Sequence, residues 1–136
     1  LQALDLSGSG TAADIATAVV YAAENGARVL NASFSGPPSE VVRLAIDYAA
    51  AHDVVVLAAA GNDHAPLERG VSPAGLTNVL AVGSIQQTDE TSPFSNFGGA
   101  LDLVAPGGGD GGSGTRPDLS ILSLLASGSL WSDDCT

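Results

Sequence analysis

The stretch Val54–Ala60 limits the fold of this chain more than any other part of the sequence. It contains only valine, leucine and alanine, and no polar residue alternates with them. Such an unbroken apolar run is typical of a parallel strand that is buried on both faces of a sheet. We therefore expect Val54–Ala60 to lie at the centre of a parallel sheet.

Further strands and two helices are expected around this central run. Short apolar stretches bounded by glycine, proline or polar residues are typical of strands, and they occur at Arg28–Phe34, Val79–Val82, Leu101–Val104 and Ile121–Leu125. Apolar residues at helical spacing follow Thr11 and Ser39. The order of these elements predicts an α/β fold in three layers, with a mainly parallel sheet and helices on both faces. Residues 1–136 are expected to form a single domain.

Residues with strong capping preferences mark the ends of both helices. Thr11 and Asp14 stand in the capping-box relation, and Gly26 is well placed to end the first helix. Ser39 is a suitable N-cap for the second helix, which we expect to end near His52.

The charge balance excludes several classes of function. The chain has 15 acidic and 4 basic residues, a formal net charge of −11. This charge repels nucleic acid and anionic membrane surfaces, so we expect neither as a partner. The single cysteine, Cys135, excludes an internal disulfide framework. No apolar run reaches the length of a membrane-spanning helix.

The end of the central run is a candidate for chemistry. Gly61 and Asn62 follow it at the carboxyl edge of the predicted sheet, where parallel α/β proteins bind their ligands. Gly61 allows the backbone to turn, and the side-chain N–H of Asn62 can donate to a developing oxyanion. An ordinary asparagine in a turn is the alternative interpretation.

Two other segments have features of ligand-binding segments. Asn31–Gly36 ends a strand whose exposed backbone can pair with an extended peptide, although a plain core strand has the same composition. Gly8-Ser9-Gly10 leads into a helix and, with Ala13, matches the G-x-G-x-x-A pattern of a dinucleotide-binding turn. The next strand ends without the carboxylate that such a site uses, which argues against nucleotide binding.

Several short motifs follow one another along nearly the whole chain. They are Gly8–Gly10, Val29–Gly36, Val54–Asn62, Ser72–Ala74, Asn78–Gly83, Ser92–Gly98 and Leu101–Gly107. In this order and spacing they resemble the central part of the subtilisin family of serine peptidases. The series A-A-A-G-N, A-V-G and A-P-G is far more specific than any one of its members.

The resemblance implies a role for each segment. Asn62 would be the oxyanion-hole side chain. The two edges that hold a substrate peptide would be Gly8, Ser9 and Gly10 on one side and Ser33, Phe34 and Ser35 on the other. The primary specificity pocket would be lined by Ala58, Ala59, Ala60 and Gly61. The resemblance also implies an extended peptide or protein substrate and secretion, and calcium is the one cofactor it suggests.

The catalytic triad of the family has no counterpart in this sequence. The D-[ST]-G, H-G-[TS]-H and G-T-S-[MF]-A motifs that carry its aspartate, histidine and serine are absent. His52 and His64 are expected to be exposed residues and not substitutes. We therefore expect a partial peptidase domain that lacks the N-terminal aspartate and histidine segments and the C-terminal serine segment, and that is inactive alone. A non-catalytic peptide-binding module is the alternative.

Two further expectations concern assembly and metals. Apolar faces that missing strands and helices would cover predict self-association of the chain. Asp110, Asp118, Asp133 and Asp134 lie in glycine-rich or polar loops, but no EF-type calcium loop surrounds them. We expect solvated carboxylates there and assign no metal ligand.

Overall fold

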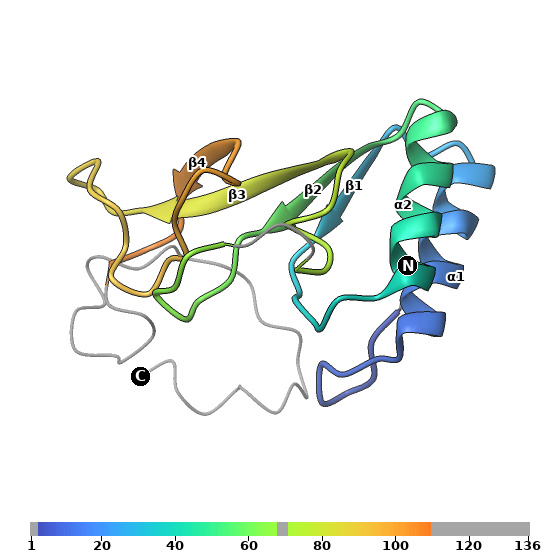
Figure 1. Cartoon of the computed structure of the whole chain (residues 1–136), viewed down its shortest axis with the longest axis horizontal. Coiled ribbons are helices and arrows are strands. Elements are labelled where there is room, and N and C mark those ends of the chain that lie inside the picture. The colour runs from blue at the N-terminus through green and yellow to red at the C-terminus, as the bar shows by residue number, and fades with distance from the viewer. Residues whose placement is uncertain (1–2, 68–70, 110–136) are drawn as a thin grey trace.

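The computed structural model describes residues 3–67 and 71–109, and within this range the chain forms two helices and four strands. Figure 1 shows both helices on one side of the sheet, where they pack against each other. Neither helix in the described range is long and apolar enough to cross a membrane.

Helix α1 (Ala12–Glu24) begins and ends as its sequence predicts. Thr11 Oγ1 accepts a hydrogen bond from the backbone N–H of Asp14, and Asp14 Oδ2 accepts one from the N–H of Thr11, both at 3.2 Å. These two bonds complete the predicted capping box. At the other end Gly26 has a φ of 82°, and the N–H of Ala27 bonds to the carbonyl of Ala22. This is the Schellman pattern that a glycine after a helix favours.

Helix α2 (Glu40–Ala51) is capped by Ser39, whose Oγ accepts from the N–H of Val42. Its buried stripe consists of Val42, Ala45, Ile46 and Ala49. On the outer surface the guanidinium of Arg43 bonds to the carboxylates of Glu40 and Asp47. After the helix, Asp53 takes the left-handed conformation with a φ of 58°. It occupies the position that Gly26 holds after α1.

The four strands form one parallel sheet: β1 (Val29–Ala32), β2 (Val55–Ala59), β3 (Val79–Ile85) and β4 (Leu103–Pro106). The strands lie in the order of the sequence, so β2 and β3 are central and β1 and β4 are the edges of this sheet. Ala32 is opposite Ala58, which in turn is opposite Ala81. The expected parallel α/β class is confirmed.

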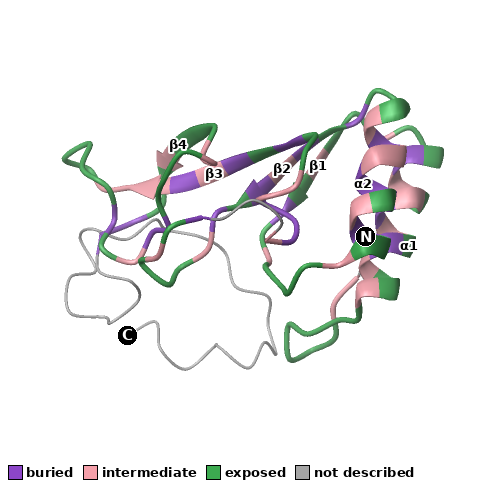
Figure 2. Ribbon diagram, in the orientation of Figure 1, coloured by how far each residue is buried: buried purple, intermediate pink, exposed green. Residues whose placement is uncertain are grey.

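Buried residues, purple in Figure 2, alternate with less buried ones along β2, so the two faces of the sheet differ sharply in burial. Val56, Ala58 and Ala81 belong to the core that the sheet shares with both helices. On the opposite face, Val29 is 63% exposed and Val55 is 47% exposed. The expectation that Val54–Ala60 is buried on both faces therefore does not hold within the described residues. The physical reason is that α1 and α2 lie on the same side of the sheet.

The strand boundaries also differ from those predicted. Strand β3 continues three residues past Val82 to Ile85, and β4 begins at Leu103 instead of Leu101. Asp102, the residue before β4, makes a side-chain contact with β3: its Oδ2 accepts a hydrogen bond from the N–H of Ala81 at 2.8 Å. The predicted strand Ile121–Leu125 lies outside the described residues.

Candidate functional site

The segment after β2 carries the candidate oxyanion donor. The backbone turns at Gly61, whose φ is 106°, a conformation that L side chains rarely adopt. Asn62 follows at the carboxyl end of the sheet and is exposed. Its side chain makes no hydrogen bond to other residues in the described range, which leaves its N–H donors directed to solvent and available to a ligand.

Asn62 lies at the rim of a cleft of about 650 Å³ on the open face of the sheet. The cleft is lined by residues from the ends of all four strands, including Ser33 after β1, Ala58–Gly61 at the end of β2, Val82–Ser84 in β3 and Ala105 in β4. Ala59 is exposed, whereas Ala60 is only 2% exposed. Of the small residues predicted to line a specificity pocket, Ala59 therefore presents its side chain and Ala60 is turned into the core.

The two predicted peptide-holding segments line a separate groove of about 330 Å³. Gly8, Ser9 and Gly10 form one wall, and Phe34, Ser35 and Gly36 form the other. Both segments are exposed except for the half-buried ring of Phe34. The structure thus brings together two segments that are separated by helix α1 and strand β1 in the sequence.

Residues 33–35 connect the two hollows. Ser33 lines the cleft that contains Asn62, and the next residues, Phe34 and Ser35, line the groove that contains Ser9. Residues 33–35 therefore border both hollows. Asn62 and Gly8–Gly10 do not share a single pocket, so the candidate site is two adjacent hollows and not one groove.

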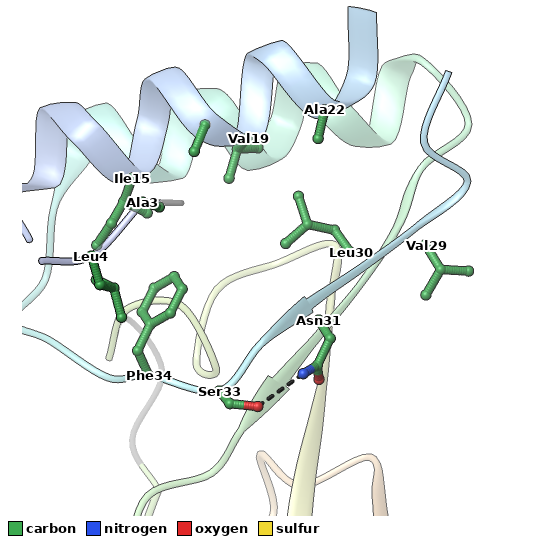
Figure 3. Close-up of a pocket in the computed structure, with 11 residues that line it drawn as sticks. Ala3, Leu4, Ile15, Val19, Ala22, Val29, Leu30, Asn31, Ser33 and Phe34 are labelled. Atoms are coloured by element: carbon green, nitrogen blue, oxygen red, sulfur yellow. Dashed lines mark hydrogen bonds between the residues drawn. The ribbon is translucent and has the colours of Figure 1, made fainter. Parts of the chain in front are cut away.

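Phe34 also borders an apolar hollow of about 530 Å³ between α1 and β1. Figure 3 shows Ile15 and Val19 from α1, and Leu30 from β1, arranged around it together with Phe34. In the same view Asn31 Nδ2 donates to Ser33 Oγ at 2.9 Å. Phe34 is half-buried and also packs against the core cluster.

The loop that carries Asn62 is held by a second segment, residues 94–97. The N–H of His64 donates to the carbonyl of Phe94 at 2.9 Å, and the N–H of Phe97 donates to the carbonyl of Ala65 at 3.1 Å. The side chain of Asn96, 7% exposed, lies inside this loop. Sequence reasoning treated Ser92–Gly98 only as a family landmark and missed this role. A polar carboxamide within an otherwise small and aromatic turn was the signal available.

Hydrogen bonds shift the pKa of one carboxylate at the other side of the site. The hydroxyl of Ser7 and the backbone N–H groups of Ser9 and Ser7 donate to Asp5, and together they hold the pKa of Asp5 below its usual value of 3.8. The ionised form of Asp5 therefore organises the turn that precedes Gly10.

Neither histidine is arranged as a catalytic base. His52 is exposed at the end of α2, where its ring stacks on that of Tyr48 at 4.0 Å between centroids. His64 is exposed in the loop after Asn62, and its ring lies edge-on to that of Phe97 with 5.3 Å between the ring centroids. The expectation that both are exposed is confirmed.

Two other interpretations find no support in the described part of the chain. Residues 3–10 form turns, not the strand that must precede a dinucleotide-binding turn, and this argues against a nucleotide site at Gly8–Gly10. No group of three or more histidine, cysteine or acidic side chains that could hold a metal occurs in residues 3–67 and 71–109. Asp110, Asp118, Asp133 and Asp134 lie outside those ranges.

Comparisons with known proteins agree on one family. The model of the Subtilase family matches residues 1–135. A thermophilic serine proteinase from Bacillus sp. strain AK1 is 44% identical over 108 residues, which are 79% of this chain and 26% of that protein. Thermitase from Thermoactinomyces vulgaris is 40% identical over 110 residues, 79% of this chain and 38% of that protein.

A solved structure gives the same result. The crystal structure of a cold adapted subtilisin-like serine proteinase superposes with a TM-score of 0.73 at 36% sequence identity, over 77% of this chain and 39% of that one. The chain therefore spans well under half the length of the relatives that it matches.

Proposed function

Because this chain belongs to the Subtilase family, we propose that it forms the substrate-binding and oxyanion part of a subtilisin-like serine endopeptidase. The observation that carries the proposal is the location of Asn62. Its carboxamide is exposed, has no internal hydrogen-bond partner in the described range, and lies beside a cleft at the carboxyl edge of the sheet. A donor with these properties can stabilise the charge that develops on a scissile carbonyl.

Asn62 acts in this proposal at the moment of nucleophilic attack. The carbonyl oxygen of the substrate gains negative charge as the tetrahedral intermediate forms, and the Asn62 Nδ2–H donates a hydrogen bond to it. Subtilisin, itself a member of this family, shows how much such a donor contributes to catalysis. Removing its oxyanion-hole asparagine reduces kcat about 10²- to 10³-fold. The attacking hydroxyl and its general base come from triad segments whose motifs this sequence does not contain.

The substrate in this proposal is an extended peptide segment of a peptide or protein. Gly8–Gly10 and Ser33–Ser35 would bind its main chain from two sides, because Phe34 and Ser35 line one groove with Gly8–Gly10 and Ser33 borders the adjacent cleft. Main-chain hydrogen bonds give such binding affinity with little demand on sequence. The exposed Ala59 leaves room for a substrate side chain in the neighbouring cleft.

The test is an Asn62→Ala variant in a protein that joins this segment to the triad-bearing parts of its domain. We expect kcat for a chromogenic peptide to fall about 10²- to 10³-fold with a much smaller change in KM. Asn25→Ala is the matched control, since Asn25 is an exposed asparagine at the end of α1. An Asn62→Ala enzyme with the parental kcat would contradict the proposal.

Residues 1–136 alone are inferred to be inactive, because an oxyanion donor without a nucleophile and base gives little rate enhancement. Rigorously purified chain should show no turnover of the same peptide, and measurable turnover would contradict this inference.

A non-catalytic peptide-binding module is the second candidate, favoured by the preformed groove between Gly10 and Ser35. Titration of the isolated chain with an unlabelled peptide would detect binding without hydrolysis.

The isolated chain is also inferred to self-associate through the open face of its sheet. Val29, Val55 and Leu80 are between 37% and 63% exposed on that face, and exposed apolar surfaces of this kind drive association. Sedimentation should show dimers or larger species, and Val55→Thr should weaken them. A strictly monomeric chain would contradict this inference.

An extracellular location follows from the family resemblance and is tested by secretion of the tagged full-length protein.

A further inference from the structure

We propose that Asn96 is a positioning residue that fixes the loop carrying Asn62 in the geometry needed for oxyanion stabilisation. The inference deepens the proposed function and rests on it. It concerns a side chain that touches no substrate and acts only through the backbone on either side of Asn62.

The carboxamide of Asn96 bonds to the chain both before and after Asn62. Its Nδ2 donates to the carbonyl of Ala60 at 2.9 Å, and its Oδ1 accepts from the backbone N–H groups of Asp63 and Ala65, each at 3.0 Å. The backbone N–H of Asn96 also donates to the carbonyl of Gly61 at 3.1 Å. The loop is therefore wrapped around one side chain, and Asn62 is at its tip.

The chemistry of this contact calls for a carboxamide. The side chain must donate to one carbonyl and accept from two N–H groups at the same time. An ionised aspartate has the same size but cannot donate, and a serine is too short to span both sides of the loop. Asparagine combines a donor and an acceptor with two lone pairs in a short, branched group, which is what these contacts use.

Asn96 is itself held against β3 by buried serines. Ser95 Oγ accepts from the N–H of Ser84 at 2.9 Å and donates to the carbonyl of Asn96 at 3.0 Å. Ser92, which has no exposed surface, shares a hydrogen bond of 2.7 Å with Ser84 Oγ and donates to the carbonyl of Gly108 at 2.6 Å. Hydrogen bonds therefore connect the loop, through Asn96 and Ser95, to strand β3 of the central sheet.

Gly61 completes the fit. A Cβ at this position would collide with Nδ2 of Asn96, and its φ of 106° independently disfavours a side chain. The close approach lets the carboxamide reach Ala60 on one side and Asp63 on the other. Asn62 and Asp63 are exposed, and the contacts with Asn96 bond to the backbone on both sides of them.

A donor in an oxyanion hole must be held to within about 0.5 Å of its productive position, and a displacement of about 1 Å can lower the rate about 10²-fold. Freeing the loop should therefore reduce transition-state stabilisation more than substrate binding. We expect Asn96→Ala to lower kcat about 10- to 100-fold, with a far smaller change in KM.

The deciding experiment is a double-mutant cycle with Asn62→Ala, in the triad-containing protein. If Asn96 acts through Asn62, Asn96→Ala should have at most about a twofold further effect on kcat once Asn62 is alanine. Full additivity of the two substitutions would overturn the inference. A normal kcat for Asn96→Ala alone would also overturn it, whereas a normal kcat for Asn62→Ala would remove the proposed function itself.

Two additional measurements separate positioning from general loss of stability. Ile46→Val, a core substitution in α2 that lies outside the site, serves as the destabilised control and should keep the parental kcat. Hydrogen exchange of the Asp63 and Ala65 amides should accelerate in Asn96→Ala but not in Ile46→Val, and equal acceleration would count against the inference. Asn96→Asp keeps the two acceptor contacts but turns an oxygen toward the carbonyl of Ala60, so it should also lower kcat, and a parental kcat would contradict the assigned donor contact. If the alanine protein does not fold, Asn96→Asp replaces it in the cycle.

Discussion

The two sides of the candidate site are built in opposite ways. The loop with Asn62 is held by hydrogen bonds to residues more than thirty positions away, with Asn96 at its centre. The turn before Gly10 is held by bonds between neighbours, in which Asp5 Oδ1 accepts from the N–H groups of Ser7 at 2.8 Å and Ser9 at 3.0 Å. One side is therefore fixed by the tertiary fold, and the other by hydrogen bonds within a local turn.

Gly61→Ala should produce the largest loss of stability, because it disrupts the loop that is fixed by the tertiary fold. The new methyl group would meet Asn96 Nδ2 in a backbone conformation with a φ of 106°. We expect the free energy of unfolding to fall by roughly 2 to 4 kcal/mol from strain and overpacking together. Urea denaturation measures it, and a loss below that of Gly8→Ala would contradict the distinction between the two sides.

Ser92→Ala should weaken the same side from further away. Ser92 is fully buried and its hydroxyl joins Ser84 to the carbonyl of Gly108. Removing it leaves buried polar groups without a partner, which costs about 1 to 3 kcal/mol. Thermal unfolding of Ser92→Ala beside the exposed variant Thr17→Ala tests this, and equal melting temperatures would show that the serine network does not support the loop.

Gly8→Ala is the counterpart of Gly61→Ala on the local side. Gly8 also has a positive φ, of 76°, but a Cβ there would meet nothing within 4 Å. Only the conformational penalty remains, and we expect a loss of about 1 kcal/mol. The urea midpoint measures this loss. A destabilisation as large as that of Gly61→Ala would mean that the turn is tied to the fold after all.

Acidification should loosen the local side alone. The pKa of Asp5 is depressed by Ser7 and Ser9, so its contribution is fully present above the ordinary value of 3.8 and is lost as the pH falls through the lower pKa of the folded state. The amide resonances of Ser7 and Ser9 should shift in that range, while that of Asn96, which donates to the carbonyl of Gly61, stays unchanged. Asp5→Asn should abolish the titration, and a titration that persists would identify another carboxylate.

Much of the framework could be predicted from local patterns. The ends of α1 are set by the side chains of Thr11 and Asp14 and by the backbone freedom of Gly26. These interactions are local, so the nearby sequence is enough to predict where the helix begins and ends. The apolar run Val54–Ala60 indicated a parallel strand correctly. It could not show how many faces are covered, because that depends on where the helices pack.

The candidate site could be predicted only in part. The segments near Ser9 and Phe34 were expected to face each other, and the structure brings them to one groove. Asn96 could not be assigned, because its partners lie around residue 62 and nothing in its immediate neighbours points there. Asp53 was missed for a different reason, since helix ends normally reserve the left-handed position for glycine.

The long sequence separation between Asn62 and Asn96 sets an order of events during synthesis. As the chain leaves the ribosome, α1, β1, α2 and β2 emerge before β3 and β4, and the two helices can already pack together. The segment around Asn62 is then outside the exit tunnel but lacks its anchor until residue 96 follows. The nascent protein therefore acquires its scaffold before its candidate oxyanion geometry.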